Sequence, residues 1–245
     1  MPLLSRYNPY RDCYFSSPNY SILAKPPFAQ LLQGSQRESL DQRVAESLRF
    51  AKELGHENAV VIGAIPFNTS KPSYLRLTSN AELKKTGEDT PSKNIPISGD
   101  KNSVTIQVGP GGDNFKHGVE KALALFGNSL LKKVVLSRTL QVTSTEGFDI
   151  NPIVDRLERC NRAGYTFAVG LKNECSDNHD ANADWNILVG ASPELLVSVR
   201  DGKITANPLA GSEPRSGNEE IDLALSKRLL SSQKDLREHR LVVSD

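Results

Sequence analysis

A glutamate and a lysine in the second half of the chain are of types that could do acid–base chemistry, and a Gly-Ser pair is predicted to lie near the glutamate. Glu194 begins the run ELLVSVR, and Asp201-Gly202 joins this run to a second one, KITANPL. Because Asp-Gly is favoured in two-residue hairpin turns, the two runs predict an antiparallel hairpin in which Arg200 faces Lys203. A carboxylate can donate or accept a proton, so the groups that this hairpin brings to Glu194 could form a site with it.

The register of the hairpin decides which side chains lie together. It places Glu194 opposite Leu209 and about two residue steps (~7 Å) from Gly211-Ser212. One face forms a core and consists of Leu195, Val197, Val199, Ile204 and Ala206. The other face is polar except for Leu196 and consists of Glu194, Ser198, Thr205 and Asn207. A strand-end glutamate and a turn glycine also occur without any function, so the spacing alone gives only a candidate site.

Lys133 lies at the start of the run KKVVLSRTLQV, which predicts a strand over residues 132–142. The apolar face of this strand consists of Val134, Leu136, Leu140 and Val142. Lys133 projects from the other face, where a lysine is usually solvated but could act as a base in dry surroundings. Further along the chain, Lys234 and Glu238 are spaced i,i+4 and predict an exposed ion pair on a helix.

The elements of the first part can be read from spacing and turn residues. Ser35 and Glu38 match a capping box, and apolar residues at helical spacing follow until Gly55 ends the predicted helix. Residues 58–67 are apolar and β-branched and predict a buried strand. Residues 1–34 are rich in Pro, Tyr and Ser and predict irregular structure with at most one strand.

A polar stretch at residues 69–112 predicts a long loop with one short strand at 104–108. We expect it to separate an N-terminal part, residues 1–112, from a second part, residues 113–245.

The second part predicts helices and strands in a mixed order. The expected elements are a helix from Asp113 or Asn114 to Gly127, the strand at 132–142, a helix opened by Asn151-Pro152, strands at 165–172 and 186–190, the hairpin, and an amphipathic helix from Glu219 onward. This order favours an α+β fold of layered β-sheets with outer helices over a regular βαβ repeat.

Composition excludes several classes of function. The 30 basic and 29 acidic side chains give a net charge of +1, so no overall field favours nucleic acid or an anionic membrane. No apolar run is long enough to span a bilayer, and the N-terminus lacks a signal-peptide core. Three distant cysteines (Cys13, Cys160 and Cys175) predict neither a zinc site nor a disulfide framework. A cytoplasmic protein is expected.

Four strings stand in a fixed order along the second part: KVVLSR (133–138), GASPELL (190–196), NPLAGS (207–212) and QKDLREH (233–239). Together they resemble the chorismate-utilising family, which contains isochorismate, salicylate, anthranilate and aminodeoxychorismate synthases. Two N-terminal strings, NPYR (8–11) and VIGAIPF (61–67), are similar to the isochorismate synthases of siderophore pathways. The resemblance covers nearly the whole chain and implies an enzyme that uses chorismate.

The resemblance implies a role for each candidate residue. Enzymes of the family that add water carry lysine at the position of Lys133, so Lys133 would deprotonate the water that attacks C2 of chorismate. Glu194 would protonate the departing C4 hydroxyl, and Gly211 and Ser212 would bind the substrate. Glu238 matches a family ligand of Mg²⁺, which would neutralise and orient the C1 carboxylate.

Three functions remain open at this point. The first is an isochorismate synthase, with a catecholate siderophore of the enterobactin type as the expected product of its pathway and channelling to downstream siderophore enzymes as a possible partnership. The second is a salicylate synthase, which shares the lysine but also eliminates pyruvate. The third is a remnant that binds chorismate without turnover.

Members of the family continue beyond the region that corresponds to this chain. They supply a second glutamate for Mg²⁺ and an arginine for a substrate carboxylate. We therefore expect the 245 residues alone to be a C-terminally truncated, poorly stable and inactive form.

Overall fold

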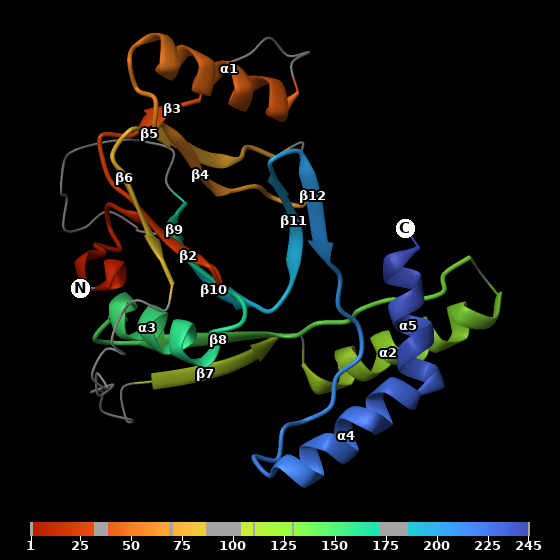
Figure 1. Ribbon diagram of the computed structural model, residues 1–245. Helices are drawn as coiled ribbons and strands as arrows, with labels where there is room; N and C mark the ends of the chain where they lie inside the picture. The colour runs from red at the N-terminus through yellow and green to blue at the C-terminus, as the bar shows by residue number, and fades with distance from the viewer. Residues whose placement is uncertain are drawn as a thin grey trace. The chain divides into compact units, whose positions relative to one another are not determined.

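The structure is a computed structural model, and its contacts divide the chain into two compact units (Figure 1). Unit 1 comprises residues 1–97 and 149–193, and unit 2 comprises residues 98–148 and 194–245. The structure describes residues 2–31, 39–68, 71–86, 104–109, 111–128, 130–171 and 186–244. Neither unit coincides with the expected parts 1–112 and 113–245, because residues 149–193 pack with the N-terminal residues; the expected division by function remains a prediction.

Unit 1 is built on a five-stranded antiparallel sheet of order β10-β9-β1-β2-β6. Its strands are β1 (Cys13–Ser16), β2 (Tyr20–Ala24), β6 (Ala81–Lys85), β9 (Tyr165–Gly170) and β10 (Ile187–Ser192). The prediction of irregular structure at residues 1–34 is wrong, because this stretch supplies β1 and β2, and β1 is the middle strand. Strands of only four and five residues, separated by Ser17, Pro18 and Asn19, give a weak local signal. In addition, β1 gains its second partner, β9, from about 150 residues away along the chain.

The main core of unit 1 lies against this sheet. Helix α3 (Ile150–Cys160) and the 3-10 helix η1 (Leu3–Arg6) flank it. The buried members of this core are Leu3, Leu4, Tyr7, Tyr14, Leu23, Val154 and Ala168. The carboxylate of Asp149 caps α3 by accepting from the Asn151 N–H at 3.2 Å, so the cap is two residues before the predicted Asn151-Pro152 start.

A smaller antiparallel sheet of order β3-β5-β4 also belongs to unit 1. It consists of β3 (Ala29–Gln30), β5 (Tyr74–Thr78) and β4 (Val60–Ala64), and helix α1 (Leu40–Glu53) precedes β4. The predicted helix and the strand within 58–67 are confirmed, but β5 and β6 fall in the stretch predicted as loop. The predicted capping box of Ser35 and Glu38 lies outside the described residues. At the observed start of α1, the Ser39 N–H donates to Gln42 Oε1 at 3.0 Å.

The described part of unit 2 contains one hairpin, one further antiparallel pair of strands and three helices. They are β7 (Val104–Gly109) with β8 (Thr139–Ser144), β11 (Leu195–Arg200) with β12 (Lys203–Asn207), and helices α2 (Gly112–Asn128), α4 (Glu219–Ser231) and α5 (Gln233–Val243). The strand predicted over 132–142 begins only at Thr139, which pairs with Gly109, the last residue of β7. Residues 131–138 therefore lie beyond the reach of β7 and form no ladder with it. The helix predicted from Glu219 onward is broken at Ser232, which caps α5.

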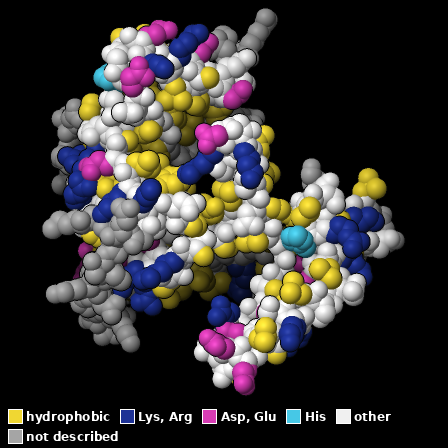
Figure 2. All heavy atoms as spheres, in the orientation of Figure 1, with side chains coloured by type: hydrophobic (Ala, Val, Ile, Leu, Met, Phe, Trp, Pro, Cys, Tyr) yellow, Lys and Arg dark blue, Asp and Glu magenta, His cyan; other side chains and the backbone are white. Residues whose placement is uncertain are grey.

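The predicted core faces of unit 2 are exposed in the structure. All buried hydrophobic side chains among the described residues belong to unit 1. In the hairpin β11–β12, Val197, Val199 and Ile204 are 54%, 65% and 71% exposed. Figure 2 shows hydrophobic side chains open on the surface of this unit. The prediction that these faces form a core is wrong for the described chain, since no element of it covers them.

The α+β fold class is confirmed by these antiparallel sheets and helices. Within the part of the chain that the structure describes, no helix has the length and apolar character needed to cross a membrane.

Candidate functional site

All five predicted site residues belong to unit 2. They are the proposed acid–base groups Lys133 and Glu194, the proposed substrate binders Gly211 and Ser212, and the proposed metal ligand Glu238. Lys133 is half-buried and lies on the extended segment 131–138, which precedes β8. This segment packs against α2: the Arg138 guanidinium stands 5.7 Å from the centre of the Phe115 ring. A Cβ at Gly118 would touch Leu136 at 3.9 Å. Helix α2, rather than a sheet partner, therefore positions the stretch that carries Lys133.

Glu194 is joined to the residue that the hairpin register placed opposite it. Its Oε1 accepts a hydrogen bond from the Leu209 N–H at 3.0 Å. The register itself is as predicted from Arg200 to Ser198 and then shifts by one residue, so that Leu195 pairs with Asn207. A β-bulge in β11 causes this shift, and a turn sequence gives no indication of a bulge.

Gly211 makes a close approach that only glycine permits. Its φ of +85° lies in the left-handed region, and a Cβ at this position would stand 2.9 Å from the Cβ of Asp235 on α5. The 208–218 loop, between β12 and α4, therefore rests directly on the helix that carries Glu238. This contact connects two of the predicted regions, and Ser212 is exposed beside it.

Two ion pairs that the sequence did not predict hold the same loop to α4. Arg228 donates to both oxygens of Glu213, at 2.7 and 2.6 Å. Arg215 donates to Asp222 at 2.6 Å. The partners are seven and fifteen residues apart and join a loop to a helix, so a periodicity search within one element does not find them.

The carboxylate of Asp222 also accepts from the N–H of Ser216 at 2.7 Å and from its hydroxyl at 2.9 Å. The backbone N–H of Ser216, with Arg215 and the Ser216 hydroxyl, lowers the pKa of Asp222 to about 2. The hydrogen bond from Arg228 likewise lowers the pKa of Glu213. Both carboxylates are therefore charged near neutral pH and fix the loop in place.

Glu238 lies on α5 in the ion pair predicted from its spacing. Lys234 Nζ stands 3.3 Å from its Oε1, and the Glu238 side chain is 36% exposed. Among the described residues, no group of three or more His, Cys, Asp and Glu side chains is arranged to hold a metal ion. Mg²⁺ usually takes one or two protein carboxylates and completes its shell with waters and substrate oxygens, so Glu238 fits as a single protein ligand.

The two proposed acid–base groups are more exposed to solvent than their proposed roles require. Glu194 is exposed and Lys133 is half-buried in the described chain. A neutral lysine and a protonated glutamate both need protection from water. The geometry thus joins Glu194 to the loop of Gly211, while the dry surroundings expected for catalysis are not supplied by the described residues.

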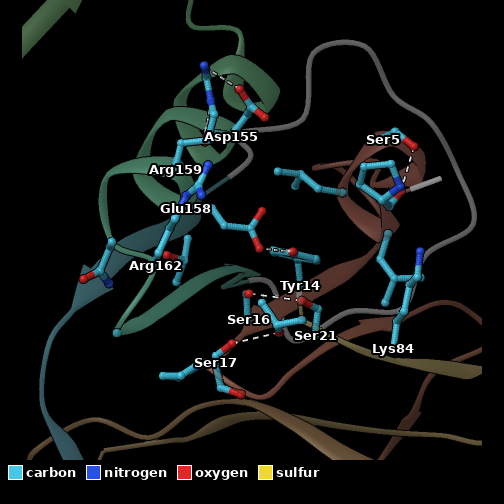
Figure 3. Close-up of a pocket in the computed structure, with 18 of the residues that line it drawn as sticks. Ser5, Tyr14, Ser16, Ser17, Ser21, Lys84, Asp155, Glu158, Arg159 and Arg162 are labelled. Carbon is cyan, nitrogen blue, oxygen red and sulfur yellow. Dashed lines mark hydrogen bonds and ion pairs between the residues drawn. The ribbon is translucent and has the colours of Figure 1, made fainter. Parts of the chain in front are cut away.

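A cavity of about 650 Å³ lies in unit 1, on the side of α3 that faces β1 and β2 (Figure 3). Both acidic residues of its wall are engaged: the Tyr14 hydroxyl donates to Glu158 at 2.7 Å, and Arg159 pairs with Asp155 at 2.6 Å. Burial, followed by the charge of Glu158, raises the pKa of Tyr14, so this hydroxyl stays a donor. Sequence reasoning missed this cavity because its walls come from elements scattered along the chain, and none of the five predicted residues lines it.

Comparison with known proteins supports the family resemblance of the sequence. A protein-family model described as chorismate binding enzyme matches residues 56–245. The chain therefore belongs to the chorismate-binding enzyme family, and the resemblance of its four strings to that family is confirmed.

Several of the similar proteins are isochorismate synthases. The chain is 35% identical to isochorismate synthase DhbC of Bacillus subtilis, over 98% of the chain and 59% of that protein. It is 32% identical to isochorismate synthase EntC of Escherichia coli, over 94% of the chain and 57% of that protein. The crystal structure of DhbC from Bacillus anthracis matches with a TM-score of 0.83 at 33% identity, covering 99% of this chain and 60% of that one. The chain thus spans a little under two thirds of the length of these relatives.

Proposed function

We propose that this chain is part of an isochorismate synthase, which converts chorismate to isochorismate. The observation that carries the proposal is the junction of Glu194 with the loop of Gly211 and Ser212, because it joins a proton donor to a group suited to hold the substrate. The similarity to isochorismate synthases over nearly the whole chain supports it. The finer features of the reaction are proposed below from the chemistry of the side chains.

In the proposed reaction, a water molecule attacks C2 of chorismate, the ring double bonds shift, and the C4–oxygen bond breaks. Lys133 takes a proton from the attacking water, and Glu194 gives a proton to the departing hydroxyl, so that the product is an isomer of the substrate. Positioned acid–base groups typically contribute about 100- to 10,000-fold to the rate of such a step. The N–H of Gly211 and the hydroxyl of Ser212 would donate to substrate oxygens.

We propose Glu238 as one ligand of Mg²⁺, beside oxygens of water and of the substrate. When bound, the metal would neutralise the C1 carboxylate and draw electron density toward it. The ion pair with Lys234 orients the Glu238 side chain on α5. Removal of Mg²⁺ by a chelator should abolish turnover.

The proposed pathway is the synthesis of a catecholate siderophore by a cytoplasmic enzyme, with possible transfer of the product to downstream siderophore enzymes. The names of the relatives support this route, since one of them is a vibriobactin-specific isochorismate synthase from Vibrio cholerae. Synthesis of menaquinone or salicylate is the alternative use of the same product.

The test is incubation of two proteins with chorismate and Mg²⁺: the 245 residues alone, and the same residues with whatever coding sequence follows them in the gene. We expect the longer protein to form isochorismate and the 245 residues alone to form none. Salicylate and pyruvate as products would show a salicylate synthase instead. Turnover by the 245 residues alone would refute their expected inactivity.

A second candidate is a protein that binds chorismate without turnover. The exposure of Glu194 favours it, because the proposed general acid then lies in water rather than in the dry site that this chemistry needs. Binding of chorismate by the longer protein with no product formed would establish this second function.

A further inference from the structure

Three neighbouring strands of the large sheet present hydroxyl groups, instead of apolar side chains, where they line the cavity of unit 1. Ser16 of β1 pairs across the sheet with Ser21 of β2 and with Thr166 of β9, so the three side chains form one row on the same face. All three are buried, at 3%, 9% and 1% exposure. The next row on this face belongs to the hydrophobic core and consists of Tyr14, Leu23 and Ala168. The face therefore changes from apolar packing to hydrogen bonding at the cavity.

This hydroxyl row has acceptor capacity to spare. Ser16 and Ser21 stand 3.1 Å apart and share a hydrogen bond. A hydroxyl has one donor and two acceptor sites, so acceptor sites are left on both. Glu158, which lines the same cavity, takes the Tyr14 hydroxyl at 2.7 Å and has further lone pairs. A ligand that faces this floor must therefore bring hydrogen-bond donors, as an alcohol or a phenol does.

The sides of the cavity are positively charged. Lys84 on β6 and Arg162 just after α3 reach it from different sides (Figure 3). The charged side chains of the lining are Lys84, Lys85, Asp155, Glu158, Arg159 and Arg162. Asp155 and Arg159 pair with each other at 2.6 Å, and outside that pair the lining holds three cations and one carboxylate. An excess of positive charge in a partly enclosed site favours an anion, and about 650 Å³ is a volume that a small organic molecule fills.

We propose that this cavity binds a small hydroxylated carboxylate. Its carboxylate group pairs with Lys84 and Arg162. Its hydroxyl groups donate to Ser16, Ser21 and Glu158. The proposal does not depend on the proposed function, because none of the residues assigned to chorismate lines the cavity.

Three probes separate the two halves of this recognition. The probe 2,3-dihydroxybenzoate carries a carboxylate and two hydroxyls, benzoate carries only the carboxylate, and catechol carries only the hydroxyls. Calorimetry measures the binding of each to the 245-residue chain and to the longer protein. We expect 2,3-dihydroxybenzoate to bind at least about tenfold more tightly than the other two, because each of them lacks two or more of the hydrogen bonds. Equal binding of benzoate, or no binding of any probe, would overturn the proposal.

Substitutions in the lining test where the probe binds. Arg162→Gln should raise the Kd for 2,3-dihydroxybenzoate about fivefold, as expected for a partly solvated ion pair. Arg156→Gln is the matched control, because Arg156 is an exposed arginine of α3 that does not line the cavity, and it should leave the Kd unchanged. Equal effects of the two substitutions would contradict a site in this cavity.

The hydroxyl row is tested by Ser21→Ala. It should raise the Kd for 2,3-dihydroxybenzoate about fivefold and leave the Kd for benzoate unchanged, because only the first probe brings hydroxyl donors to the row. A variant that merely folds badly would lose both probes alike. Equal losses are therefore resolved by thermal unfolding of the variant, and equal losses in a variant of normal stability would overturn the role of the row.

A ring carboxylate also resembles chorismate, so the proposed chorismate site must be excluded as the place of binding. Gly211→Ala should leave the Kd for 2,3-dihydroxybenzoate unchanged, since Gly211 does not line the cavity. A rise in this Kd in Gly211→Ala, with none in Arg162→Gln, would place the probe in the chorismate site and overturn the proposal. If the longer protein forms no isochorismate but the probe binds as expected, the proposed function fails and the cavity site stands.

Discussion

At the scale of single residues, Glu194 combines a structural contact with a proposed chemical one. Its carboxylate accepts from the Leu209 N–H and so ties the start of β11 to the 208–218 loop. A glutamine can accept the same hydrogen bond but cannot release a proton. The two roles of Glu194 can therefore be separated by choosing the substitution.

If the proposed function holds, Glu194→Gln should lower turnover of chorismate by about 100- to 10,000-fold and change the Kd for chorismate by less than about twofold. Glu194→Ala should weaken chorismate binding as well, because it also frees Leu209. The measurements are isochorismate formation and calorimetric binding on the same preparations. Normal turnover by the glutamine variant would remove Glu194 as the general acid.

Both the backbone conformation of Gly211 and its contact with Asp235 favour glycine at this position. Alanine at a φ of +85° is strained, and its Cβ would meet Asp235 at 2.9 Å. Gly217 is a matched control, because its φ is +81° and a Cβ there would have nothing within 4 Å. Gly211→Ala should raise the Kd for chorismate about tenfold, whereas Gly217→Ala, which shares the strain without the clash, should change it little. Equal effects would show that backbone strain, and not contact with α5, fixes the loop.

At the scale of elements, the carboxylate of Asp222 accepts several hydrogen bonds at the start of α4. Asp222 accepts from Ser216 and Arg215, and these bonds hold its pKa at about 2, below the ordinary 3.8. A carboxyl group whose pKa falls on folding stabilises the folded state above its ordinary pKa and loses that contribution as the pH falls through the folded value. The loss for Asp222 therefore lies between pH 3.8 and about pH 2.

Asp222→Asn should be less stable than the unaltered protein at neutral pH, and the difference should shrink as the pH is lowered through this window. Denaturant unfolding followed by the helical signal at several pH values measures it. Glu219→Gln, in the same first turn of α4, is the control and should leave the pH dependence as it is. A difference that stays constant down to pH 2 would mean that the bonds to Asp222 do not form.

At the scale of the whole molecule, the two units differ in what holds them together. The buried hydrophobic side chains of the described chain all lie in unit 1, most of them around β1, β2, β9 and α3. Unit 2 has paired strands and helices whose apolar side chains are exposed to solvent. Leu196 is 88% exposed and Ile204 is 71% exposed. Local stability follows buried apolar contact, so unit 2 should open more readily than unit 1.

Hydrogen exchange on the 245-residue chain should therefore be slowest in β1, β2 and β9 and distinctly faster in β11, β12 and α4. The measurement is mass spectrometry of peptides from both units at one pH and temperature. Dilution of the sample is the control, because association of the open faces would slow exchange in a concentration-dependent way. Equal protection of both units in dilute solution would contradict this prediction.

The sequence by itself determined the features whose cause is local. Asp201-Gly202 specified the hairpin turn, apolar spacing specified the helices, and the i,i+4 spacing specified the pair of Lys234 and Glu238. Four strings were enough for the family, because they keep their order and separation. The turn also brought Glu194 close to Leu209, but the predicted register is shifted by one residue there, and a side-chain hydrogen bond makes the contact.

Only the tertiary structure decided the rest, because the remaining contacts join residues that no local rule connects. The strands β1 and β2 became the middle of a sheet through β9, far along the chain. The segment of Lys133 is placed by α2 and not by a strand partner. The loop of Gly211 is held by the ion pair of Arg228 with Glu213 and by the contact of Gly211 with Asp235. Side-chain types and spacing thus indicated which groups could do the chemistry, and long-range packing and electrostatics determined which of them meet.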